Sequence, residues 1–106
     1  MLNILLICQG GMSSSFVVRK IKEAFENKGE YIHILSKASM EIVDYIEETD
    51  IVLVAPNVLY EIEDIRETCT QHGITPVILP MELYGRMDGD ALRVFIINSQ
   101  NGGNDS

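Results

Sequence analysis

The sequence predicts an α/β domain with a doubly wound, four-stranded parallel sheet and helices on both faces. Short apolar segments alternate with longer segments of helical periodicity, which is the pattern of a parallel sheet with helical crossovers. Residues 51–55 include no polar side chain, as expected for a strand that is covered on both faces. Because residues 3–8 are similarly apolar, we expect these two strands in the middle of the sheet, in the order 2-1-3-4.

The first half of the chain supplies two strand–helix pairs. The first strand is expected at 3–8, and it leads into a helix over about 13–28 that stops at Gly29, a residue type that readily adopts left-handed backbone. The second strand, at 31–35, is short and partly polar, as expected at the edge of a sheet. A helix follows at about 38–47. Its inward-facing residues are expected to be Ile42, Val43 and Ile46.

The third strand, 51–55, is followed by a turn in which Asn57 is a candidate N-cap for a helix at about 58–71. Cys69 falls on the apolar face of that helix, so we interpret it as a core residue. The fourth strand is expected at 76–79.

The last part of the chain is expected to form a loop at 80–89, with a helical turn at about 81–84, and then a final helix. The composition of 90–97 also suits a strand, but acidic residues at its start favour a helix, which would complete the cover of the sheet. Residues 98–106 lack apolar side chains and are expected to be a disordered tail. We therefore expect one domain over 1–97.

Size and charge exclude several functional classes. With 106 residues, 46% of them hydrophobic, the chain is long enough to enclose a single core. Its net charge of −8, from 16 acidic and 8 basic residues, argues against a nucleic-acid partner, because phosphates repel an acidic surface. No apolar run approaches the roughly 18 residues that span a bilayer, and no signal peptide is recognisable. We expect a cytoplasmic protein that does not insert into membranes.

The cysteines and the basic residues give two further indications. The two cysteines form no Cys-x-x-Cys pair and lie near no histidine cluster, so we expect neither a metal nor another cofactor. Arg19, Lys20 and Lys22 follow one another closely in the first helix. They are either a solvated face or a guide for an acidic or phosphorylated partner.

Cys8 is the strongest candidate for chemistry, because it ends the first strand where a Gly/Ser-rich segment opens a helix. The unpaired N–H groups and positive dipole of a helix N-terminus stabilise a thiolate, and also a phosphoryl group bound to its sulfur. Glycines let the backbone approach an anion closely, and serines add hydroxyl donors. The expected phosphoryl-binding loop consists of Gln9, Gly10, Gly11, Met12, Ser13, Ser14 and Ser15.

The edge of the sheet supplies the other candidate residues. Ligands of doubly wound sheets bind at the carboxyl ends of the strands, so the turn at 55–57 and the loop at 80–89 should lie beside Cys8. The expected rim of the site therefore includes Pro56, Asn57 and Tyr84.

Other roles for Cys8 are less well supported. A cysteine at a strand end is often a small core residue, but a strand that merely ends does not need such a long Gly/Ser-rich segment. A low-molecular-weight phosphatase needs an arginine six positions later, where this chain has Ser14. A Cys–His hydrolase needs a histidine, yet His33 is expected inside an edge strand and His72 at the end of a helix. Binding a phosphoryl group without an acid, a metal or a hydrolytic base is typical of a carrier.

Three segments together resemble one known family. Residues 6–15 read Leu-Ile-Cys-Gln-Gly-Gly-Met-Ser-Ser-Ser, similar to a Cys-x-x-Gly-Met-Ser-Thr-Ser loop. The Ala-Pro-Asn turn at 55–57 is similar to Gly/Ala-Pro-Gln, and residues 83–89 are similar to Tyr-Gly-x-x-Asp-Gly. These are the motifs of the lactose/cellobiose-type IIB components of the bacterial sugar phosphotransferase system, and the resemblance covers residues 3 to about 97.

The resemblance implies that Cys8 accepts a phosphoryl group from the phosphohistidine of a IIA protein and donates it to a sugar held by a membrane-embedded IIC permease. The sugar would belong to the β-glucoside or disaccharide class, such as cellobiose, chitobiose or lactose. The chain departs from the family pattern at Gln9-Gly10, Ser14 and Asn57, which affects the inference of a sugar but leaves the phosphoryl chemistry intact. The alternatives are a regulatory or binding module of the same fold and a phosphatase-like or arsenate-reductase-like enzyme.

Overall fold

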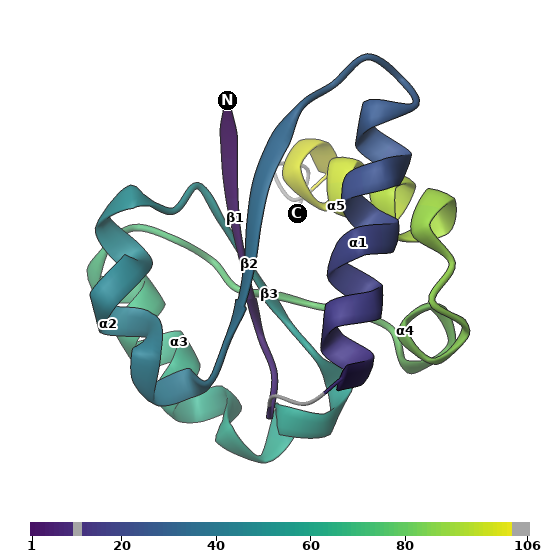
Figure 1. Ribbon diagram of the computed structural model, residues 1–106. Helices are drawn as coiled ribbons and strands as arrows, with labels where there is room; N and C mark the ends of the chain where they lie inside the picture. Colours follow the sequence, from purple (N-terminus) through teal and green to yellow (C-terminus); the bar gives the residue numbers. More distant parts are fainter. Residues whose placement is uncertain (10–11, 103–106) are drawn as a thin grey trace.

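The strands form one parallel sheet in the order β2-β1-β3-β4, as the sequence predicts (Figure 1). The computed structural model describes residues 1–9 and 12–102. The strands are β1 (Leu2–Ile7), β2 (Ile32–Lys37), β3 (Ile51–Val54) and β4 (Val77–Ile78). From β1 the chain passes outward to β2 and then returns to β3 on the other side, so the strand order switches between β1 and β3.

Helices cover both faces of this sheet. In Figure 1, α1 (Met12–Glu26) and α5 (Gly89–Gly102) pack together on one face, while α2 (Ile42–Tyr45) and α3 (Ile62–Gln71) lie on the other. The short helix α4 (Met81–Arg86) follows β4 and leads into α5. The remaining helical segments are 3-10 turns at η1 (Ser39–Glu41), η2 (Ile46–Glu48) and η3 (Pro56–Glu61).

The two central strands form the middle of the core, because helices exclude water from both of their faces. All four residues of β3 are buried, and so is β1 from Ile4 onward. Burying a Leu, Ile or Val side chain contributes about 1.5–3 kcal/mol, so these strands hold the sheet together. Backbone pairing also extends past β1, because the Cys8 N–H donates to the Lys37 carbonyl at 3.0 Å. The cysteine is therefore positioned by the sheet itself.

The crossover between β2 and β3 differs from the expected helix at 38–47. It consists of short 3-10 and α-helical turns, η1, α2 and η2. Ile42 and Ile46 are buried as expected, but the expectation for Val43 is wrong, since that side chain is 64% exposed. Residues four apart share one helix face, and the neighbouring position turns away from it. The short crossover therefore buries Ile42 and Ile46, which are four residues apart, and leaves Val43 on the exposed side.

The helix expected at about 58–71 starts differently. A 3-10 segment, η3, precedes α3, and the backbone bends within it at Val58 (φ −119°, ψ 22°). The helical segment begins with Pro56 in its first turn, a position that suits proline because no helical N–H is needed there. The N-cap is therefore Ala55, and the expectation that Asn57 caps the helix is wrong.

The predicted final helix is confirmed, and it is longer than expected. α5 runs from Gly89 to Gly102, so residues 98–102, which we expected in a disordered tail, are helical. Residues 103–106 lie outside the described residues. The helical turn expected at 81–84 is also present, as the start of α4.

We expect Gly89→Ala to destabilise the fold, because a Cβ at this position would overlap the backbone carbonyl of Lys20 where α5 begins beside α1. Overpacking of this kind costs about 1–3 kcal/mol. The matched control is Gly85→Ala in α4, where a Cβ meets no neighbouring atom. It should leave stability unchanged or raise it by up to about 1 kcal/mol. Urea unfolding of both variants tests this, and equal midpoints would contradict the packing argument.

Candidate functional site

Cys8 lies at the carboxyl end of β1, beside the point where the strand order switches. Its neighbours are the end of β2 on one side and the end of β3 on the other. The Ala55 N–H donates to the Ile7 carbonyl at 2.9 Å, which brings the turn after β3 next to the cysteine. Doubly wound sheets bind their ligands at this place. The position of the cysteine agrees with the sequence prediction.

The loop that follows Cys8 leads into α1. Gly10 and Gly11 lie outside the described residues, and α1 begins at Met12. Ser13 and Ser14 belong to its first turn, together with Ser15, whose side chain is exposed. That turn includes no acidic residue, so no carboxylate within it offsets the positive end of the helix dipole.

The Cys8 side chain is buried, with 1% of its surface exposed. Its Sγ lies 2.9 Å from the Oγ of Ser36, near the end of β2. Ser36 is not among the site residues that the sequence predicts. The sequence does contain a signal for it, because this serine follows Ile32 and Ile34, which are apolar and buried on the same face of the strand.

Tyr84 of α4 is the second polar residue associated with the cysteine. Its hydroxyl oxygen is buried and has no hydrogen-bond partner among the described residues. Burial raises the pKa of Tyr84, and the neighbouring Cys8 sulfur raises it further. A buried hydroxyl without a partner is unusual in a folded protein and calls for an explanation. Here the phenol keeps its proton and is an unused donor close to the cysteine.

The remaining site candidates lie on segments that connect to one another around the sheet edge. The Gln9 side-chain amide donates to the Tyr60 hydroxyl at 3.0 Å, which joins the start of the loop to η3. Pro56 and Asn57 open η3, the former partly buried and the latter exposed. The Ser39 hydroxyl donates to the Glu61 carboxylate, which joins η1 to η3.

An apolar rim surrounds this edge. Each segment that leaves the carboxyl end of a strand carries a large, exposed apolar or aromatic side chain, between 41% and 84% exposed. These side chains are Phe16 on α1, Met40 on η1, Leu59 and Tyr60 on η3, and Met81 on α4. Exposed apolar side chains gathered around one site are typical of a surface that binds another protein.

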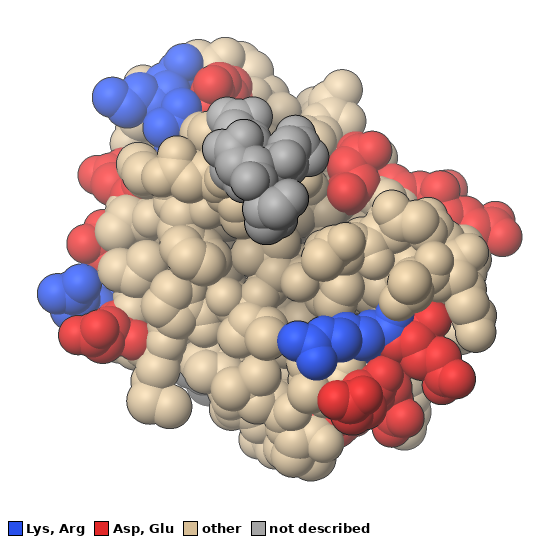
Figure 2. All heavy atoms as spheres, turned by 180° about the vertical axis from the view of Figure 1, so that it is seen from behind, with Lys and Arg blue, Asp and Glu red and all other residues tan. Residues whose placement is uncertain are grey.

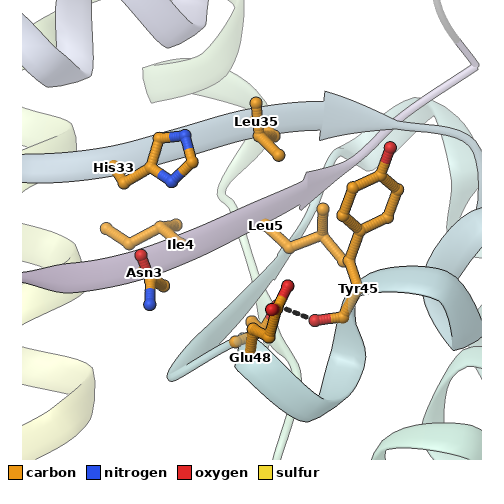
Figure 3. Close-up of a pocket in the computed structure, with 8 residues that line it drawn as sticks. Asn3, Ile4, Leu5, His33, Leu35, Tyr45 and Glu48 are labelled. Carbon is orange, nitrogen blue, oxygen red and sulfur yellow. Dashed lines mark hydrogen bonds between the residues drawn. The ribbon is translucent and has the colours of Figure 1, made fainter.

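The two histidines lie away from Cys8. His33 of β2 pairs with Asn3 at the opposite end of β1, and it lines a hollow of about 410 Å³ on the α2 face of the sheet (Figure 3). Figure 3 shows Tyr45 and Glu48 across that hollow from the strands. His72 follows α3, where its Nδ1 contacts the Thr68 carbonyl at 3.2 Å. Neither histidine is placed to act as a base on the cysteine.

Among the described residues, neither the charged side chains nor the potential metal ligands form another candidate site. Within residues 1–9 and 12–102, no group of three or more His, Cys, Asp or Glu side chains could hold a metal ion. On the face shown in Figure 2, acidic side chains lie mainly toward the sides and the basic ones are scattered, so this face presents no continuous basic surface. In the part of the chain that the structure describes, no helix combines the length and apolarity needed to cross a membrane.

Comparisons with known proteins agree with this geometry. The family model of the lactose/cellobiose-specific IIB subunit of the PTS system matches residues 3–94. The oligo-β-mannoside-specific EIIB component of Bacillus subtilis is 30% identical over 89 residues, which are 84% of this chain and 86% of the relative. The cellobiose-specific EIIB component of Lactococcus lactis is 27% identical over 103 residues, 92% of this chain and 95% of the relative. The solution structure of a cellobiose-specific phosphotransferase IIB component from Borrelia burgdorferi is 30% identical, with a TM-score of 0.78 over 95% of this chain and 93% of that chain.

We expect iodoacetamide to label Cys8 before Cys69 near neutral pH. Both side chains are buried, but burial raises the pKa of Cys69, and the thiolate is the reactive form of cysteine. Cys8 lies ahead of the N-terminus of α1, where the positive end of the helix dipole attracts negative charge. Labelling with limiting reagent, followed by peptide mass mapping, measures the order. Equal or reversed labelling would contradict the expectation that Cys8 is the more reactive cysteine.

Proposed function

Because the chain belongs to the lactose/cellobiose-specific IIB family of the sugar phosphotransferase system, we propose that Cys8 carries a phosphoryl group between two protein partners. The donor is the phosphohistidine of a IIA protein, and the acceptor is a sugar held by a IIC permease. The observation that carries this proposal is the position of the Cys8 sulfur, at the carboxyl end of β1 and immediately before the loop that opens α1. A phosphoryl group attached there meets the positive end of that helix.

The proposed transfer has two steps. In the first, the Cys8 thiolate attacks the phosphorus, the S–P bond forms, and the P–N bond breaks with its electron pair returning to the imidazole, which keeps or takes up the proton that makes it neutral. In the second, a sugar hydroxyl oxygen attacks the phosphorus and the O–P bond forms. The sulfur then leaves with the S–P electron pair as a thiolate, and the hydroxyl proton passes to a base outside this chain. Both steps are in-line displacements that depend on positioning and on stabilisation of the transferring charge.

We assign phosphoryl binding to the loop Gln9–Ser15 and to the rim residues. Backbone N–H groups and hydroxyls of this segment are the donors that a phosphoryl group requires. The Tyr84 phenol supports the assignment, because its hydroxyl is buried near Cys8 without a partner among the described residues. We propose that it donates to a phosphoryl oxygen once Cys8 is phosphorylated. Pro56 and Asn57 border the same edge of the sheet through η3.

We propose the apolar rim as the surface on which the partners dock. A IIA protein must bring its phosphohistidine to a sulfur that is itself buried, and a ring of exposed apolar side chains provides contact area around that point. The IIC permease would use the same edge in turn, because both partners must reach the same phosphorus. We propose a sugar of the β-glucoside or disaccharide class, to which cellobiose, the sugar named for the Lactococcus lactis relative, belongs.

The contacts of two of the four arginines, Arg19 and Arg93, favour a carrier over a phosphatase. Phosphatases of the cysteine type hold the phosphate with a bidentate arginine. The Arg19 guanidinium lies over the Phe16 ring, 5.4 Å from its centre. The guanidinium of Arg93 pairs with Glu30 at 2.6 Å, and Glu30 follows the C-terminal end of α1, whereas Cys8 precedes its N-terminal end.

We expect Cys8→Ser to abolish acceptance of label from a ³²P-labelled IIA phosphoprotein, with a loss of more than about 100-fold, because a serine hydroxyl is a poor nucleophile at neutral pH. Cys69→Ala is the matched control and should accept label at the rate of the unmodified protein, since Cys69 is buried within α3. Labelling of Cys8→Ser at the unmodified rate would exclude Cys8 as the acceptor.

We expect the phosphorylated protein to keep its label at neutral pH after the donor is removed. The Cys8 side chain is shielded from water, and neither histidine lies close enough to activate a water molecule. Addition of membranes that contain the permease, together with the sugar, should then discharge the label as sugar phosphate. Following ³²P with and without these membranes measures both properties.

The outcomes of this experiment separate the alternatives. Rapid release of inorganic phosphate without membranes would contradict the carrier and favour a phosphatase. A stable label that no sugar discharges would favour a regulatory module of the same fold.

A further inference from the structure

The register of the sheet determines the contact between Cys8 and Ser36. Ser36 pairs with Leu6 of the neighbouring strand, and Cys8 follows Leu6 by two positions. Side chains two residues apart in a strand project from the same face, so both polar side chains project from one face of adjacent strands. The 2.9 Å between Sγ and Oγ is therefore a consequence of strand pairing.

Ser36 also departs from the pattern of its own strand. Ile32 and Ile34 precede it on the same face and are 4% and 7% exposed. A third apolar residue would continue this row, whereas a partly buried hydroxyl is costly unless it forms a hydrogen bond. The sulfur is the hydrogen-bonding group beside it, which accounts for a serine at this position.

We propose that the Ser36 hydroxyl donates a hydrogen bond to the Cys8 thiolate and thereby makes the sulfur a better leaving group, an inference that rests on the proposed phosphoryl transfer. Either atom can donate while the thiol is protonated. Once the proton is lost, the thiolate can only accept, so the hydroxyl must be the donor. Hydrogen bonds to a charged acceptor are about twice as strong as neutral ones.

The hydrogen bond acts on the two transfer steps in opposite directions. When the S–P bond breaks toward the sugar oxygen, its electron pair moves onto the sulfur, and the Ser36 hydroxyl stabilises that charge. When the thiolate attacks a phosphohistidine, the same hydrogen bond stabilises the attacking group and makes it less nucleophilic. Ser36 therefore biases the carrier toward delivery of its phosphoryl group.

The neighbouring elements carry other groups that bear on the charge of Cys8. The Tyr84 phenol of α4 lies near enough for the Cys8 sulfur to raise its pKa, which keeps the phenol neutral. Lys37 follows Ser36 and places its ammonium 5.1 Å from the centre of the Tyr45 ring, on the α2 side. Ala55, which follows β3 and is bonded to Ile7, has an uncharged side chain. The first turn of α1 includes no acidic residue. Comparing the pH dependence of Cys8 alkylation between Ser36→Ala and the parent isolates the effect of Ser36, because the two proteins share every other group around the cysteine.

The test compares Ser36→Ala with the parent, both in a Cys69→Ala background so that Cys8 is the only thiol. We expect the pH of half-maximal alkylation of the unphosphorylated protein to rise by about one unit, a tenfold change in the ratio of thiolate to thiol. Ser36→Thr keeps the hydroxyl and should restore the parent profile. Ser99→Ala is the matched control, since its Oγ donates to the Ile96 carbonyl within α5. Urea unfolding verifies that each variant is folded.

The same variants then test the leaving-group effect. Phosphorylated Ser36→Ala should discharge to sugar about tenfold more slowly than the parent, and Ser36→Thr at the parent rate. An unchanged alkylation profile in Ser36→Ala would overturn the hydrogen bond, and an unchanged discharge rate would overturn its role in transfer. If the parent accepted no phosphoryl group at all, the proposed function would fail, while the alkylation profile would still decide the hydrogen bond.

Discussion

The backbone hydrogen bonds that hold β1 between its two neighbours continue one residue beyond the strand, and this extension determines where the Cys8 sulfur lies. The Cys8 N–H is bonded to the carbonyl of Lys37, and the Ile7 carbonyl is bonded to the N–H of Ala55. Ile7, Cys8 and Ala55 are buried, and a buried backbone group without a partner would be costly. The ends of β2 and β3 are therefore held beside the cysteine by the same forces that stabilise the fold.

This constraint places two hydroxyl groups near the sulfur. Ser36 contacts it directly, and the Tyr84 phenol lies near enough for the sulfur to raise its pKa. Neither group is a base that would activate water, whereas both are able to donate hydrogen bonds. Surroundings of this kind suit a group that must be held and then released to another acceptor, because they stabilise negative charge without promoting hydrolysis.

The segments around the sheet edge are joined to one another as well as to the strands. Gln9 is bonded to Tyr60, and Ser39 is bonded to Glu61, so η3 connects to both the loop after β1 and the crossover after β2. The apolar rim is carried by these connected segments. A partner that docks on the rim would therefore contact segments whose positions are coupled to the site.

The sequence by itself determined the parallel sheet, its strand order, the position of Cys8 and the final helix, because apolar runs, helical periodicity and loop composition are local signals. It also carried the family motifs, which lie at the ends of strands. Only the tertiary structure decided the contact between Cys8 and Ser36, which are 28 residues apart, and the burial of the Tyr84 hydroxyl. It also decided that the crossover after β2 forms short turns and exposes Val43. These features depend on strand register and on how distant segments pack, and no local pattern of residues encodes either one.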